Sequence, residues 1–152
     1  MHSNTLKQLQ DIGAFVLASG CTKKTIKQVA EMIRAACDYR WVGIYKIVRG
    51  DFVIVGKTGK CPPAYPRFPT TQGLAATAVE SKQSVMVADV HKDPRYLPTF
   101  GSTMSEIVVP IISESGRAVG LIDVESEKLN AFTEKDREFL ERAAALLARA
   151  LK

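Results

Sequence analysis

The sequence has no apolar run near the roughly 18 residues that a membrane-spanning helix needs. Its first ten residues are polar and lack the apolar centre of a secretory signal peptide. These two absences lead us to expect a cytoplasmic protein with no membrane contact. Apolar residues nevertheless make up 46% of the 152 residues, which is enough for a core, and the length fits one domain spanning 1–152.

Ligands for a structural metal are also scarce. The three cysteines, Cys21, Cys37 and Cys61, form no close pair, and the histidines are only His2 and His91. An odd number of separated cysteines argues against a disulfide framework, and no cluster of cysteine and histidine has the spacing of a zinc site. We therefore predict neither a metal nor a cofactor.

Positive charge is present without the pattern that nucleic-acid binding needs. The net charge is +5 at pH 7, but basic and acidic residues are interspersed, and the densest cluster is Lys23, Lys24 and Lys27. Proteins that bind nucleic acid gather basic residues on one face, often with interleaved aromatic residues. We interpret the three lysines as a solvated helix face and do not expect a nucleic acid as partner.

Apolar residues that recur at helical spacing predict three long helices. The first spans residues 4–19 and ends at Gly20, the second begins after Thr22, and the last begins at Thr133, where Asp136 completes a capping pattern. Their apolar stripes are Leu6, Leu9, Gly13, Val16 and Leu17, then Ile26, Val29, Ala30, Ile33, Ala36 and Cys37, and finally Phe139, Leu140, Ala143, Leu147 and Ala150. Because Cys37 lies on such a stripe, we take it as a core residue rather than a nucleophile.

Strand signals lie between these helices. Aromatic and β-branched residues predict strands over residues 41–48, 52–55, 85–87, 106–112 and 118–125, and an Ala-rich helix is expected over 73–81. Gly50-Asp51 is the expected turn of the first hairpin, and Pro110 predicts an edge or a bulge in its strand. Two long loops, 57–72 and 88–105, are candidate functional segments. Hairpins in this order predict an α+β fold, with an antiparallel sheet and helices packed on one face.

Three acids are expected to meet on one face of that sheet. Asp123 and Glu125 are two residues apart on a strand, so their side chains share a face. A two-residue turn at 114–115 would set Glu106 opposite Asp123, and a turn at 115–116 would set it opposite Glu125. Both registers bring the three carboxylates together.

The chemistry of such a cluster favours an ammonium or amidinium ligand. Without a cation, mutual repulsion is expected to raise the pKa of at least one acid. Two alternatives remain open. A bulge at Pro110 would reverse the facing of Glu106, and one or two of the acids could be surface groups or accept backbone N–H bonds at a loop.

Six short segments are distributed over most of the chain. They are Trp41-Val-Gly-Ile-Tyr45, Gly73-Leu-Ala-Ala-Thr77, Val87-Ala-Asp-Val90, Ser105-Glu-Ile-Val-Val-Pro-Ile111, Gly120-Leu-Ile-Asp-Val-Glu-Ser126 and Phe132-Thr-Glu-Lys-Asp136. In this order they resemble the GAF family of small-molecule sensor domains. The resemblance implies a GAF-like antiparallel sheet, with the N- and C-terminal helices packed on one face and loops and a short helix over the other.

Within that family the pattern is closest to the free methionine-(R)-sulfoxide reductases, which reduce the free amino acid in a pocket under two loops. The resemblance implies that Glu106, Asp123 and Glu125 are substrate-binding acids and that Trp41 and Tyr45 form an aromatic pocket wall. For the two aromatic residues, ordinary core packing is the alternative.

The cysteines that the reductase chemistry needs do not match. The resemblance places them near Tyr65, Ala75 and Thr99, none of which carries sulfur, and Cys61 is displaced from the first of these positions. A thiolate must attack the sulfoxide sulfur and a second thiol usually resolves the product, which a hydroxyl cannot do. We therefore expect a binding protein with no catalytic residues.

Three functions are compatible with these observations. The first is a stand-alone GAF domain that binds a small ligand, such as an amine or amino acid, and signals through a protein partner or as a homodimer formed by its first and last helices. The second is a diverged reductase that uses Cys61. The third is a structural interaction module with a collapsed pocket. A pocket lined by Glu106, Asp123 and Glu125 would favour the first two, and a thiol beside it would favour the second.

Overall fold

The computed structural model of the chain describes residues 3–20, 22–59 and 62–151. Within these ranges, six strands form one antiparallel sheet in the order β3-β2-β1-β6-β5-β4. In chain order they are β1 (Trp41–Val48), β2 (Asp51–Lys57), β3 (Arg67–Pro69), β4 (Val85–Val87), β5 (Ser105–Ile112) and β6 (Ala118–Ser126). The α+β fold predicted from the sequence is confirmed.

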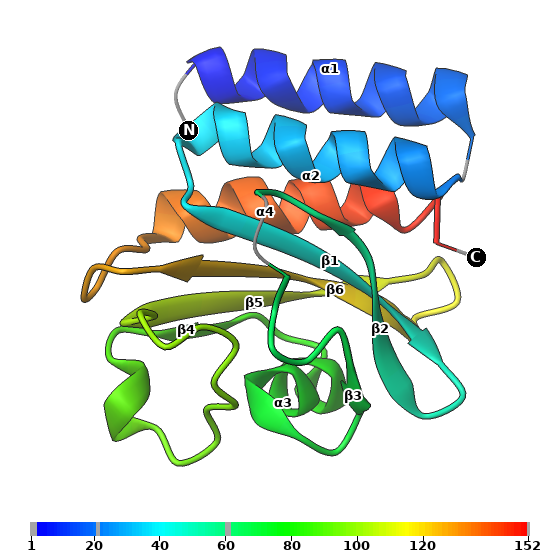
Figure 1. Ribbon diagram of the computed structural model, residues 1–152. Coiled ribbons are helices and arrows are strands. Elements are labelled where there is room, and N and C mark those ends of the chain that lie inside the picture. The colour runs from blue at the N-terminus through cyan, green and yellow to red at the C-terminus, as the bar shows by residue number, and fades with distance from the viewer. Residues whose placement is uncertain (1–2, 21, 60–61, 152) are drawn as a thin grey trace.

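The helices divide between the two faces of the sheet. Helices α2 (Lys23–Cys37) and α4 (Glu134–Leu147) cover one face, and α1 (Ser3–Ser19) packs on both of them as an outer layer (Figure 1). Helix α3 (Gly73–Ser81) and the two long loops, one with a short 3-10 helix at Val90–Lys92, cover the other face. In the part of the chain that the structure describes, no helix is long and apolar enough to cross a bilayer.

Helices α2 and α4 begin at the predicted polar caps. The backbone N–H of Thr25 donates to Thr22 Oγ1 at 3.2 Å, and the backbone N–H of Thr133 donates to Asp136 Oδ2 at 2.8 Å. Such bonds satisfy backbone donors that a helix start leaves without an internal partner. These local signals explain why both starts could be read from the sequence.

The main core lies between the helices and one face of the sheet. The predicted stripes of α2 and α4 are largely buried there, and Cys37 is half-buried and packs against this core. The strands contribute alternate residues, namely Val42, Ile44, Ile107, Val109, Ile111, Ile122 and Val124. This period of two leaves the intervening residues of β1, β5 and β6 facing the loops.

The predicted stripe of α1 is wrong at two positions. Leu6 and Leu17 are exposed, at 45% and 79%, whereas Ile12 is fully buried. Because α1 packs on two helices rather than on the sheet, its buried stripe is narrow and consists of Leu9, Ile12 and Val16. The two exposed leucines border an apolar groove between α1 and α4.

The hairpin of β1 and β2 turns one residue earlier than predicted. Val48 pairs with Asp51, so the turn is Arg49-Gly50, with φ angles of +51° and +81°. Two positive φ angles are typical of the tight turn that matches the twist of paired strands. Asp51 therefore belongs to β2, where its carboxylate pairs with Arg67 of β3 at 2.8 Å. Strand β3 lies inside a segment predicted as loop only, and its terminal Pro69 is tolerated at a sheet edge.

The hairpin of β5 and β6 forms neither of the two-residue turns considered above. The backbone N–H of Ser113 donates to the carbonyl of Arg117 at 2.8 Å around the three-residue loop 114–116. Gly116 has a φ of +83°, which a three-residue hairpin loop requires at its last position.

The register of the acids depends on a bulge in this hairpin. The loop alone would set Glu106 opposite Val124 and turn its carboxylate toward the helices. A one-residue shift in the pairing at 111–112 compensates, and Glu106 lies opposite Glu125. Pro110 is not bulged. The pairing of β4 ends before it, so the proline occupies a stretch of β5 that is locally an edge.

Candidate functional site

The face of the sheet under the loops carries the acids and aromatic residues in three rows. Trp41 of β1 pairs with Glu125 of β6, which pairs with Glu106 of β5. The next row holds Asp123 opposite Gly43, and the third places Tyr45 opposite Leu121. Directly paired residues share a face, so the five predicted site residues all lie on the loop side of the sheet.

The three carboxylates converge. One oxygen from each of Glu106, Asp123 and Glu125 lies within 4.8 Å of the others, and the residues are only 6%, 6% and 0% exposed. They are therefore not surface groups. The structure brings together the acids that the sequence predicted would meet.

The hydrogen bonding of the cluster is incomplete. Thr103 Oγ1 donates to Glu125 Oε1 at 2.9 Å. Asp123 Oδ1 and Glu125 Oε2 are buried and have no hydrogen-bond donor among the described residues while the acids are ionised, and a proton on the cluster is shared in hydrogen bonds between Asp123 and the two glutamates. A buried polar group without a partner costs on the order of 1–3 kcal/mol, and a charged one costs more.

Burial and mutual repulsion change the acidity of all three groups. Burial is the largest cause, and it raises the pKa of Glu106 to about 8, with repulsion from Glu125 adding to it. Burial and the nearby Asp123 raise the pKa of Glu125 to about 9, and the pKa of Asp123 is raised well above its usual range. The predicted rise is confirmed, although desolvation contributes more than the repulsion that we expected. The empty cluster therefore retains protons near pH 7.

Two aromatic side chains bound the acids. Trp41 and Tyr45 are 4% and 2% exposed, and they belong to a second apolar cluster that is separate from the main core. The rings of Phe100 and Trp41 pack edge-on with their centres 5.1 Å apart, and those of Phe68 and Tyr45 pack edge-on with their centres 5.6 Å apart. The Trp41 ring also lies over Gly43, where a Cβ would collide with it. Since Gly43 pairs with Asp123, this glycine lets the indole lie beside the acids.

A small cavity remains beside two of the acids, Glu106 and Asp123, whereas the predicted site residues Trp41 and Glu125 are not part of its wall. Its volume is about 20 Å³, and its walls include Tyr45, Gly73, Thr99, Glu106 and Asp123. A space of this size holds about one water molecule. The site is closed, and an amino acid could enter it only if the covering loops moved.

The positions that the resemblance assigns to cysteines are also in this wall. Tyr65, Ala75 and Thr99 all line the cavity, so the wall has no sulfur at these positions. Cys37 lies on the helix side of the sheet, where burial raises the pKa of its thiol. Cys61 and Cys21 lie outside the described residues, and so does the prediction that gave Cys61 a redox role.

Loop residues complete the site in ways that the sequence did not indicate. Thr103 bonds Glu125, and Phe100 packs on Trp41, yet both come from a segment predicted only as an irregular loop. Among the described residues, Glu106, Asp123 and Glu125 are also the one group of His, Cys, Asp and Glu side chains arranged to hold a metal ion.

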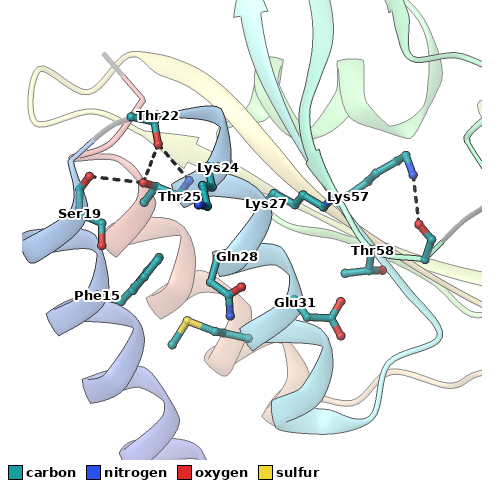
Figure 2. A pocket seen from close by; sticks show the side chains of 12 residues that line it. Phe15, Ser19, Thr22, Lys24, Thr25, Lys27, Gln28, Glu31, Lys57 and Thr58 are labelled. Carbon is teal, nitrogen blue, oxygen red and sulfur yellow. Dashed lines mark hydrogen bonds between the residues drawn. The ribbon is translucent and has the colours of Figure 1, made fainter.

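A much larger hollow lies between α1, α2 and the end of β2. Its volume is about 890 Å³, and Lys24, Lys27 and Lys57 stand around it with Phe15 and Glu31 (Figure 2). Lys24 and Lys27 are exposed, as predicted for a solvated helix face. None of the predicted site residues lines this hollow.

Comparisons with known proteins agree with this architecture. The GAF domain family model matches residues 22–151. A free methionine-R-sulfoxide reductase of Saccharomyces cerevisiae is 36% identical over 74% of this chain, and the match spans 63% of the yeast protein. GAF domain-containing protein A of Dictyostelium discoideum is 30% identical over 80% of this chain and 76% of its own length.

Solved structures give the same result. A free methionine-R-sulfoxide reductase from Neisseria meningitidis, in complex with its substrate, superimposes with a TM-score of 0.87 at 27% identity, covering 97% of this chain and 87% of that one. A type II free methionine-R-sulfoxide reductase from Thermoplasma acidophilum is 32% identical with a TM-score of 0.72, covering 83% and 94%. The chain belongs to the GAF domain family.

Proposed function

We propose that this GAF domain binds a small organic cation, an amino acid or a related amine, whose ammonium group is held by Glu106, Asp123 and Glu125. The observation that carries the proposal is the convergence of three buried carboxylates, two of which have an oxygen with no donor other than a proton shared within the cluster. An ammonium group has three donors. With bonds of about 2.8 Å in tetrahedral directions, its acceptors stand about 4.6 Å apart, which is within the 4.8 Å that encloses one oxygen of each acid.

The surroundings of the acids favour an organic cation over a metal ion. Hard cations such as Ca²⁺ and Mg²⁺ generally need six or more oxygen ligands. Here the indole of Trp41 and the phenol ring of Tyr45 bound the site instead. Aromatic faces attract organic cations by about 0.5–2 kcal/mol.

The relatives support the same ligand class. Several are named free methionine-R-sulfoxide reductases, and the substrate in that name is an amino acid with an ammonium group. We infer that this chain retains the binding of such a ligand without the reaction, because the cavity wall at Tyr65, Ala75 and Thr99 carries no thiol. A diverged reductase is the second candidate function, which the names of these relatives favour.

Signalling would follow from assembly. We propose that the domain forms a homodimer through α1 and α4, or passes its output to a protein partner there. The groove between these helices is lined by Leu6, Leu17 and Leu146, and Leu17 is 79% exposed. A second copy would remove these apolar side chains from water.

Titration calorimetry with free methionine-R-sulfoxide tests the ligand proposal. Asp123→Asn should weaken binding by about 1–3 kcal/mol, the usual range for losing a hydrogen bond to a charged group. Glu114→Gln is the matched control, because Glu114 is an exposed acid at the far hairpin turn and should leave the affinity unchanged. Equal affinities for both variants would show that the acids are structural.

A further inference from the structure

The closed cavity depends on the segment 95–104, which we call the lid. Leu97 and Thr99 from the lid contribute to the cavity wall, and Thr103 bonds Glu125 below it. Because the cavity has room for about one water, a ligand reaches the acids only after the cover moves, and the lid is one part of that cover beside the segment 65–75. We propose that Arg40 is the latch that holds this lid closed and sets the rate at which ligands enter and leave.

Arg40 contacts the lid in two ways. Its Nη2 donates to Ser102 Oγ at 3.1 Å, and its guanidinium carbon stands 5.5 Å from the centre of the Phe100 ring. The first contact is a charge-assisted hydrogen bond and the second is a cation–π contact. The same side chain therefore contacts both a polar and an aromatic residue of the lid.

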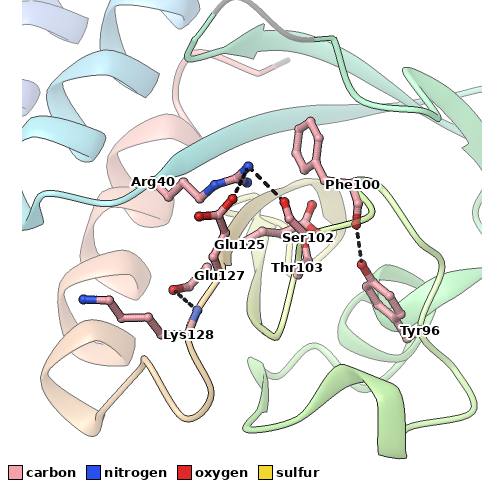
Figure 3. Close-up of polar contacts among 9 residues, drawn as sticks. Arg40, Tyr96, Phe100, Ser102, Thr103, Glu125, Glu127 and Lys128 are labelled. Atoms are coloured by element: carbon pink, nitrogen blue, oxygen red, sulfur yellow. Dashed lines mark hydrogen bonds and ion pairs between the residues drawn. The ribbon is translucent and has the colours of Figure 1, made fainter.

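Glu127 fixes the latch to the body of the domain. Its Oε1 forms an ion pair with Arg40 Nη2 at a distance of 2.9 Å. Arg40 directly precedes β1 and Glu127 directly follows β6, so the pair stands at the end of two adjacent strands. Figure 3 shows the guanidinium between Glu127 and Ser102, with Phe100 beside it. An arginine suits this place because its planar fork can serve several partners at once.

The latch lies outside the site that it closes. Arg40 is not part of the cavity wall, and its side chain is 37% exposed. Phe100 transmits its effect, because the ring touched by Arg40 also packs edge-on against Trp41. The proposal requires the lid to re-form its contacts with Arg40 over a bound ligand around which the cavity has widened, and the latch then contributes equally to the barriers for entry and exit. Removing it speeds both steps and leaves their ratio, the Kd, unchanged.

The first test needs no ligand. Trp41 is the single tryptophan of the chain and packs on the lid, so quenching of its fluorescence by acrylamide reports lid opening. In Arg40→Ala the quenching constant should rise at least about twofold, and hydrogen exchange should accelerate in the lid but not in β5 and β6. Arg40→Lys keeps the charge without the planar group, so its quenching constant and lid exchange rate should lie between those of the original protein and Arg40→Ala.

The matched control is Arg117→Ala. Arg117 is an exposed arginine at the opposite end of β6, and its loss changes the net charge by the same amount. It should leave quenching and exchange as in the original protein. Equal quenching and exchange in Arg40→Ala and Arg117→Ala would overturn the latch.

The second test rests on the proposed function and uses free methionine-R-sulfoxide in stopped-flow mixing. Arg40→Ala should raise the association and dissociation rates together by roughly five- to thirty-fold, the size expected for losing one such hydrogen bond and one cation–π contact. The Kd should stay within about twofold. A weaker Kd with unchanged rates of lid exchange would instead make Arg40 a ligand contact and contradict the proposal. If the original protein binds none of this ligand while lid exchange responds to Arg40→Ala, the latch stands and the ligand proposal fails.

Discussion

Strands β1, β5 and β6 contribute to both faces of the sheet, and neighbouring side chains on them are buried in very different surroundings. On β6, Ile122 faces the helices and is fully buried among apolar residues, whereas its neighbour Asp123 faces the loops and is buried beside two other acids. Burial of Ile122 stabilises the fold, and burial of Asp123 costs free energy unless a partner is present. The difference indicates that the helix face maintains the structure, and it supports the proposal that the loop face carries a binding site.

The largest effect is expected on the helix face. Ile122→Ala should lower the free energy of unfolding by about 2–5 kcal/mol, because it removes a buried side chain and leaves a cavity. Denaturant titration measures this loss. A cost below about 1 kcal/mol would mean that the two faces do not differ as described.

On the loop face, replacing a buried acid should have the opposite effect and raise the free energy of unfolding. Glu106 and Glu125 have pKa values of about 8 and about 9 in the folded protein, so the folded state holds more protons than the unfolded chain from roughly pH 4.5 upward. Their contribution to stability is complete below that pH and is lost as the pH rises through 8 and 9. Asp123, whose pKa is raised in the same direction, adds to this dependence.

Asp123→Asn should therefore stabilise the empty domain. We expect a gain of about 1–2 kcal/mol at pH 8 and a smaller gain at pH 5, because a raised pKa costs the folded protein less stability at lower pH. Thermal unfolding at the two pH values measures the difference, with Glu114→Gln as control. A gain that is equal at both pH values would contradict the buried-acid account.

A substitution on helix α1, the outer layer of the helix face, tests whether this side of the domain also forms the homodimer. Leu17→Glu places a charge on the most exposed of the groove leucines. If α1 and α4 form the dimer, this change should weaken self-association at least tenfold, about 1.4 kcal/mol. Sedimentation analysis would decide, and a monomer at high micromolar concentration in the original protein would refute the homodimer.

The smallest effect is expected when the loop face is assayed for reductase activity. With free methionine-R-sulfoxide and a thiol reductant, the protein should show no turnover above background, because Tyr65, Ala75 and Thr99 offer no thiolate. Turnover that disappears in Cys61→Ser would establish the diverged reductase instead.

Much of the fold could be predicted from local signals. The caps at Thr22 and Thr133 and the β-rich run from Trp41 act within a few residues, so the sequence located those elements. The turn at Arg49-Gly50 and the short strand β3 were missed, because the backbone angles of the turn and the pairing of a three-residue strand depend on neighbouring strands.

The residues of the site could be predicted from the sequence, but the strand register and the cavity that they form could be predicted only in part. Strand periodicity placed Asp123 and Glu125 on one face, but the register of Glu106 required a three-residue loop and a bulge that compensate each other. The contact behind the proposed latch could not be predicted, because Arg40 and Ser102 are 62 residues apart and meet only in the folded chain. The narrowness of the cavity likewise follows from how the loops pack.

The central claim is that the loop face holds a cation between three buried acids. Calorimetric titration at pH 7 in two buffers of different ionisation enthalpy tests it most directly, with free methionine-R-sulfoxide compared to a cyclic nucleotide. Because the empty acids retain protons, an ammonium ligand should bind with measurable proton release, and a phosphate-bearing nucleotide should give no binding heat. Tight binding of the nucleotide, or amine binding with no proton released, would contradict the account.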